Sequence, residues 1–178
     1  MTIKEIIKLC NQMADLEVSE SCFESDTLDS KAQKLVQCSN LALEKLYGVA
    51  TELHSTTVTA AKGFIDLSAL KLDRVISLTY LGKNASFRYG KNGLHVKNDG
   101  KYTLVFAAKA PKLGWADEVV LPSPRISERI FAYGIIAEFF YSLSDFSSAK
   151  VWENRFENAL HTVTLKTSSL TMPVGRWT

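Results

Sequence analysis

The spacing of apolar side chains along the chain predicts four helices. Apolar residues recur every three or four positions, the period of an amphipathic helix, over 2–15, 26–47, 124–143 and 147–163. Between the second and third helices the period falls toward two and β-branched residues become frequent, which predicts short strands. Residues 15–25 are acidic and have no clear period, so we expect a loop there.

Tight turns separate the expected strands. Asn92-Gly93 and Asn98-Asp99-Gly100 each favour a sharp reversal of the chain. The strands expected around these turns cover 56–59, 64–68, 74–80, 85–89, 94–96 and 102–106. Strands joined by such short turns pair antiparallel, so they should form a small sheet or barrel.

These elements together predict an α+β fold, namely a four-helix bundle with an inserted small antiparallel β-sheet or barrel and an extended C-terminal arm. We expect residues 1–49 and 122–164 to form the helical bundle. Residues 50–121 form the expected β insertion and residues 165–178 the arm.

The third expected helix is apolar nearly all round, which indicates that more than one of its sides is covered. Either the core of the chain or a second subunit covers it. The candidate subunit-interface residues are Phe131, Ile135 and Phe139 on this helix and Trp152 on the next.

The C-terminal arm ends in residue types that are common at interfaces. Met172, Pro173, Arg176 and Trp177 lie close together in its sequence, and Trp and Arg often dominate binding energies. Two placements stay open: the arm folds back on its own core, or it docks on a neighbouring protein.

Composition excludes several classes of protein. The chain has 178 residues, of which 46% are hydrophobic and 22% charged, as in an ordinary globular domain rather than a disordered or collagen-like chain. The three cysteines, Cys10, Cys22 and Cys38, are odd in number and lack C-x-x-C spacing, so neither a disulfide framework nor a zinc site is expected. No apolar run is long enough to span a membrane, and we expect a soluble protein made in a reducing cytoplasm.

Charge is unevenly distributed along the chain. Residues 15–30 contain six carboxylates and no Lys or Arg, whereas residues 71–112 contain nine bases against two acids, a local excess of +7. The candidate DNA-facing residues in the basic stretch are Lys83, Arg88, Lys91 and Lys97. Three interpretations stay open: contact with nucleic acid, complementary faces that meet between copies of the chain, or a solvated strand surface.

Motifs for catalysis are not found in the sequence. There is no phosphate-binding loop, no G-x-S-x-G elbow and no H-E-x-x-H pair. His54, His95 and His161 lie far apart in the sequence, and none has a second His or a Cys within one helical turn. We therefore expect no catalytic residue, no metal site and no cofactor, and an enzyme with dispersed site residues is the weakest hypothesis.

The last third of the chain resembles the head–tail adaptor proteins of tailed bacteriophages, of the connector or tail tubular type. The resemblance rests on the runs Arg125–Phe140, Ser144-Asp145-Phe146, Ala149–Leu160 and Met172–Trp177. Two positions depart from the pattern, because Phe156 stands where Tyr is usual and Gly175 where Arg is usual. Residues 38–44 also resemble the second helix of such adaptors.

The resemblance implies a virion structural protein. Such adaptors form a ring of about twelve copies between the portal and a downstream tail or nozzle protein in the neck of the virion, and they are assembled in the host cytoplasm. Double-stranded DNA passes through the ring without being read in sequence. In this picture Met172, Pro173, Arg176 and Trp177 bind the portal or a neighbouring subunit. The alternative function is a sequence-independent nucleic-acid-binding module that uses the basic β surface.

Overall fold

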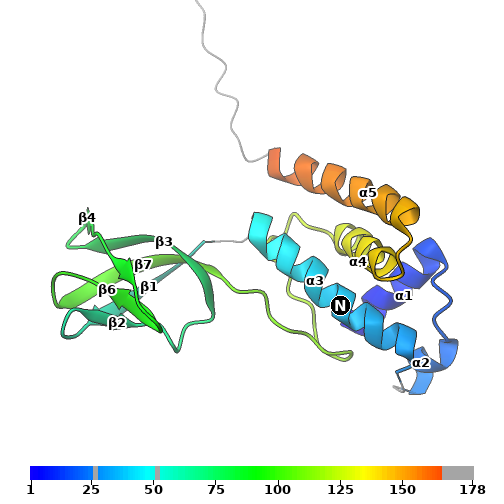
Figure 1. Ribbon diagram of the computed structural model, residues 1–178, viewed down its shortest axis with the longest axis horizontal. Coiled ribbons are helices and arrows are strands. Elements are labelled where there is room, and N and C mark those ends of the chain that lie inside the picture. The colour runs from blue at the N-terminus through cyan, green and yellow to red at the C-terminus, as the bar shows by residue number, and fades with distance from the viewer. Residues whose placement is uncertain (26–27, 51–52, 166–178) are drawn as a thin grey trace, which may run out of the picture. The chain divides into compact units, whose positions relative to one another are not determined.

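The computed structural model describes residues 1–25, 28–50 and 53–165. Within these residues the chain has an α+β fold with five helices and two antiparallel sheets (Figure 1), which confirms the predicted class. The chain divides into two compact units. Among the described residues, the helical unit comprises Met1–Leu43 and the chain from Leu113 to Leu165, and the β unit comprises Glu44–Lys112.

Side-chain caps mark the starts of some of the helices. In chain order the helices are α1 Ile3–Ala14, α2 Glu20–Ser25, α3 Ser30–Ala50, α4 Glu128–Ser142 and α5 Phe146–Leu165. At the start of α1, the Thr2 hydroxyl accepts a hydrogen bond from the Glu5 backbone N–H, and the Glu5 carboxylate accepts one from the Thr2 N–H. Ahead of α3, the Asp29 carboxylate accepts a hydrogen bond from the Ala32 N–H at 2.6 Å.

The loop expected over residues 15–25 is wrong in part, because α2 occupies its second half. Leu16, Val18 and Cys22 are buried there, and the Phe23 ring stacks on Trp115 with 5.8 Å between ring centroids. A helix of six residues is too short to show a period in the sequence. Tertiary packing therefore forms a helix that the apolar pattern does not reveal.

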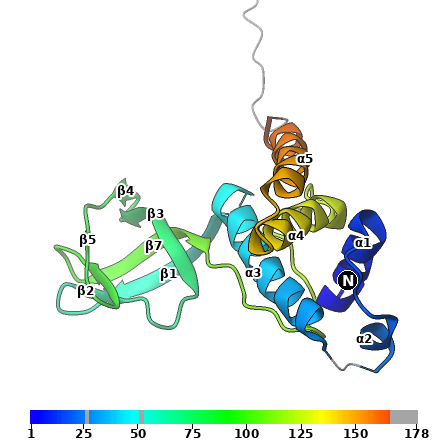
Figure 2. The ribbon, with the colours of Figure 1, turned by 45° about the vertical axis from the view of Figure 1, so that its right-hand side comes forward.

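Helix α4 lies at the centre of the helical unit. It packs against α1 and α5 (Figure 2). Its buried residues are Ile130, Phe131, Ala132, Gly134, Ile135, Ile136, Ala137 and Phe139. Buried residues occur on most sides of this helix, which explains the lack of a polar face in its sequence.

Two sheets make up most of the β unit. The four-stranded sheet has the order β1 (Leu53–Ala60), β7 (Gly100–Ala108), β3 (Leu72–Tyr80) and β4 (Lys83–Asn84). The three-stranded sheet has the order β2 (Phe64–Asp66), β6 (Gly93–His95) and β5 (Arg88–Tyr89). Every pair of neighbouring strands is antiparallel.

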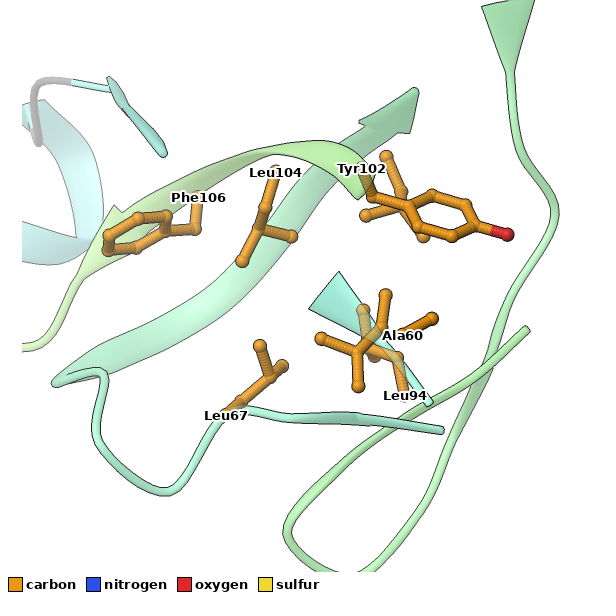
Figure 3. Packing of buried hydrophobic residues seen from close by; sticks show 8 residues of the cluster. Ala60, Leu67, Leu94, Tyr102, Leu104 and Phe106 are labelled. Atoms are coloured by element: carbon orange, nitrogen blue, oxygen red, sulfur yellow. The ribbon is translucent and has the colours of Figure 1, made fainter. Parts of the chain in front are cut away.

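The β unit has its own hydrophobic core between these sheets. Tyr102, Leu104 and Phe106 alternate along β7, so their side chains share one face of the strand. Figure 3 shows these three side chains facing the side of the core that holds Leu67 and Leu94. Because this core uses residues of the β unit, the strands can hold surface side chains in fixed positions.

The strand expected over residues 85–89 is wrong in extent. Only Arg88 and Tyr89 pair with β6, and Lys83 and Asn84 pair instead with the end of β3. The connecting residues 85–87 lead from the four-stranded sheet to the three-stranded one. This crossing creates the surface described next.

Candidate functional site

The basic side chains of the β unit are exposed. Within residues 71–112 the exposed bases are Lys71, Arg74, Lys83, Arg88, Lys91, Lys97, Lys101, Lys109 and Lys112. Counted over the whole of Glu44–Lys112, eleven Lys and Arg stand against five Asp and Glu, a net charge of +6. The rest of the chain has ten bases and fourteen acids, a net charge of −4.

Two adjoining hollows lie where the chain crosses between the sheets. The first has a volume of about 340 Å³ and includes Lys83, Ser86 and Lys97 in its lining. The second has a volume of about 390 Å³ and is lined by Ser86, Phe87, Arg88, His95, Val96 and Lys97. Ser86 and Lys97 line both, so the two hollows adjoin. We call the two hollows together the cationic groove and define it by Lys83, Ser86, Arg88, His95 and Lys97.

Strand pairing fixes the two sides of the cationic groove. Lys83 lies opposite Tyr80 in the β3–β4 pair, and Arg88 lies opposite His95 in the β5–β6 pair. Between them the Ala85 N–H donates a hydrogen bond to the Leu78 carbonyl at 2.8 Å. The backbone that carries Lys83 and Arg88 is therefore held at both ends and in the middle.

Aromatic rings support the turn that carries Lys97. The rings of Tyr80 and Tyr102 pack with 4.7 Å between centroids. The Tyr102 hydroxyl donates a hydrogen bond to the Asn98 carbonyl at 2.8 Å, and the Tyr80 hydroxyl donates one to the Asp99 carbonyl at 3.3 Å. These contacts tie the turn after Lys97 to strands β3 and β7.

Lys91, the fourth candidate DNA-facing residue, lies outside the cationic groove. It lines a separate hollow of about 330 Å³ that also holds Asp73 and Tyr89. The structure therefore brings together Lys83, Arg88 and Lys97 but not Lys91. The sequence did not indicate that His95 and Ser86 line the same hollows as the basic residues. Which residues lie close together here depends on the register of the paired strands.

The lining of the cationic groove suits an anionic ligand. It carries the cations of Lys83, Arg88 and Lys97 and contains no carboxylate side chain. Asn84, Ser86 and Asn98 add neutral side chains that can donate hydrogen bonds. Lys and Arg bind phosphate oxygens strongly, so this combination can hold phosphate groups.

The aromatic rings that line the cationic groove are mostly covered. Tyr102 is only 2% exposed, because its ring belongs to the core. Tyr80 in the first hollow and Phe87 in the second are half-buried, and the His95 imidazole is exposed. Tyr89 is 64% exposed, but it lines the Lys91 hollow. The lining thus offers phosphate contacts and only a limited surface for stacking on bases.

The candidate subunit-interface residues separate into two groups. Phe131 and Ile135 are 0% exposed and Phe139 is 2% exposed, so the helical unit itself buries them. Their apolar character therefore needs no second subunit to explain it. Trp152 is half-buried at the surface, between the Tyr133 ring at 5.8 Å and the Arg155 guanidinium at 4.5 Å. Of the four residues, only Trp152 offers surface to a partner.

The candidate portal-binding residues Met172, Pro173, Arg176 and Trp177 lie outside the described residues. The helix that leads to them, α5, ends at Leu165.

Metal-ligating and thiol side chains were the candidate reactive groups of the sequence. No group of three or more His, Cys, Asp or Glu residues is arranged there to hold a metal ion. The three thiols are free and buried. Burial raises the pKa of the Cys38 thiol to about 11 and raises that of Cys10 as well, so these thiols are held in the protonated, unreactive form.

No protein-family model matches the chain, and no curated protein matches it significantly. None of the helices in the described ranges has both the length and the apolar character that a membrane span requires.

Proposed function

We propose that the protein is a virion structural protein that forms an adaptor ring between the portal and the tail of a bacteriophage, with DNA passing through the ring. The observation that carries the proposal is the order of its parts. A helical unit built from two separate stretches of the chain, Met1–Leu43 and the described residues from Leu113, is interrupted by a compact unit, Glu44–Lys112, that contains the antiparallel strands. Head–tail adaptors, which the last third of the sequence resembles, have the same order of parts. The finer proposal is that α1, α3, α4 and α5 form a four-helix bundle.

Exposed apolar side chains support a role in assembly. Leu41, Leu143, Phe146 and Val151 in the helical unit are each about half or more exposed, and Phe146 reaches 65%. A ring forms when one face of each copy contacts a different face of the next copy. Apolar side chains that remain in solvent in one chain are suited to such contacts.

Trp152 belongs to the proposed contact surface. Arg129, Tyr133, Trp152 and Arg155 lie in a row along α4 and α5: the Arg129 guanidinium is 5.9 Å from the Tyr133 ring centroid, and Arg155 covers Trp152. Arg, Tyr and Trp are the residue types most enriched where interfaces concentrate their binding energy. The proposal assigns this row to contacts between neighbouring copies, in place of the buried Phe131 and its neighbours.

The C-terminal segment 166–178 provides the test of the proposed portal attachment. Deletion of this segment should leave the helical and β units folded but abolish co-sedimentation with the portal protein encoded in the same genome. The double variant Arg176→Ala/Trp177→Ala should weaken co-sedimentation, whereas Thr167→Ala/Ser168→Ala, in the same segment, should not. Normal co-sedimentation of the truncated chain would show that the segment does not attach the ring to the portal.

A further inference from the structure

We propose that the cationic groove binds the sugar–phosphate backbone of double-stranded DNA, with Lys83, Arg88 and Lys97 contacting phosphate groups. The site is a property of the β unit alone. The inference does not depend on the adaptor assignment, because a phosphate-binding groove can serve a protein of any assembly state.

Charge draws a polyanion toward this unit. The β unit carries a net charge of +6, and the remainder of the chain carries −4. Neutralising DNA phosphates releases condensed counterions, and this release is the main source of affinity in sequence-independent binding. The charge separation also orients the chain, because DNA is attracted to the β unit and repelled by the rest.

The three cations are distributed over the two adjoining hollows. Lys97 lines both hollows, Lys83 lines only the first and Arg88 only the second. Neither hollow is therefore lined by all three cations. Cations distributed in this way are suited to several phosphates of a backbone, whereas a single small anion would need converging donors.

The acidic stretch of a second copy is a less suitable occupant of the cationic groove. Glu17 already pairs with Lys31 at 2.8 Å, and the Asp29 carboxylate caps α3 through Ala32. Two of the six carboxylates in residues 15–30 are thus already bound within their own chain. Nucleic acid carries phosphates at regular intervals and has no such competing partners.

The same lining is less suited to single-stranded than to duplex nucleic acid. Proteins that hold single strands combine cations with exposed aromatic rings on which bases stack. Among the rings that line the cationic groove, Tyr102 is buried and Tyr80 and Phe87 are half-buried, so the His95 imidazole is the exposed one. The three cations Lys83, Arg88 and Lys97 are all exposed and can contact phosphates without reading bases.

The test compares two triple variants of the full chain that lose the same charge from the same unit. Lys83→Gln/Arg88→Gln/Lys97→Gln removes the cations of the cationic groove. The matched control, Lys71→Gln/Lys101→Gln/Lys109→Gln, removes three exposed lysines from elsewhere on the β unit. Fluorescence anisotropy with a short labelled duplex of arbitrary sequence, titrated between about 50 and 200 mM salt, reports affinity and its salt dependence. Thermal unfolding confirms that both variants remain folded.

We expect the groove variant to lose at least about tenfold in duplex affinity and its log–log salt slope to fall by about 2.7, which is three phosphate contacts at about 0.9 each. The control should lose much less affinity. Equal losses in both variants, or no binding by the unaltered chain, would overturn the proposal. Tighter binding of a single strand of the same sequence would overturn the duplex assignment.

Two further measurements distinguish DNA binding by the groove from self-association and from portal attachment. Sedimentation of the same variants without DNA reports self-association, and a groove variant that loses self-association but keeps DNA affinity would assign the groove to a second copy instead. Co-sedimentation of the groove variant with the portal tests the adaptor proposal separately. We expect the groove variant to retain portal binding, because that proposal rests on the C-terminal segment and not on the groove.

Discussion

The missing side chain at Gly134 allows three helices to approach closely. A Cβ atom at this position of α4 would lie 3.1 Å from the Phe156 ring of α5 and 3.2 Å from the Ala42 Cβ of α3. Both distances are shorter than ordinary van der Waals contact between carbon atoms. The need for a glycine at this position becomes clear only when the neighbouring helices are in place.

Substitution of Gly134 by Val should therefore destabilise the helical unit. The added methyl groups crowd Phe156 and Ala42, and overpacking of this kind costs about 1–3 kcal/mol. The matched control is Gly48→Val in α3, where a Cβ would meet nothing within 4 Å. We expect the control to change the free energy of unfolding by less than about 0.5 kcal/mol. Urea unfolding of both variants measures the difference, and equal stabilities would contradict the packing described for Gly134.

At the scale of elements, apolar periodicity predicted α1, α3, α4 and α5, and each of these helices buries apolar residues. The ends of these helices were less well predicted. The helix expected from residue 124 begins at Glu128, because a turn precedes it in which the Ile126 N–H bonds to the Ser123 carbonyl. A turn that contains Pro124 resembles a first helical turn in sequence, and only its hydrogen bonds distinguish the two.

The start of α5 depends on a charged cap. The Asp145 carboxylate accepts hydrogen bonds from the Ser147 hydroxyl at 2.7 Å and the Ser148 N–H at 3.1 Å. Hydrogen bonds from the Ser148 and Ser147 side chains and the Ser148 backbone lower the pKa of this carboxyl from its ordinary value of 3.8. The ionised carboxylate is therefore favoured in the folded chain over the unfolded one.

This cap predicts a pH-dependent stability. The contribution of Asp145 is fully present above its unfolded pKa of 3.8 and is lost as pH falls through the lower folded pKa. The variant Asp145→Asn keeps a hydrogen-bond acceptor but does not titrate. Between pH 7 and pH 3 the melting temperature of the original chain should therefore fall further than that of the variant. If the melting temperatures of the original chain and of the variant fall by the same amount between pH 7 and pH 3, the Asp145 carboxylate does not act as the cap.

At the scale of the whole molecule, the sequence predicted the mixed fold and the uneven charge but not how the basic residues are grouped. Lys83, Arg88, Lys91 and Lys97 look alike in the sequence. Strand register brings three of them together and leaves Lys91 beside Asp73. The apolar pattern of α4 was ambiguous in the same way. It would be the same whether the core of the helical unit or a second subunit covered Phe131.

The ring proposal connects the remaining features of the molecule. In this proposal the surface aromatic and apolar side chains on α4 and α5 would contact neighbouring copies, and the cationic lining of the β unit would face DNA. Each chain carries a positive net charge on its β unit and a negative net charge on the rest. In a ring, contacts between unlike faces of neighbouring copies are therefore favoured, since like-charged faces repel. The prediction at this scale concerns assembly rather than a reaction.

Electron microscopy of the full chain mixed with the portal protein from the same genome would show whether the chain assembles into a ring on the portal. We expect an added ring at one end of the portal, with the rotational symmetry of that assembly, and no such ring with the chain truncated after residue 165. Bare portals in the presence of excess folded full-length chain would contradict the adaptor assignment.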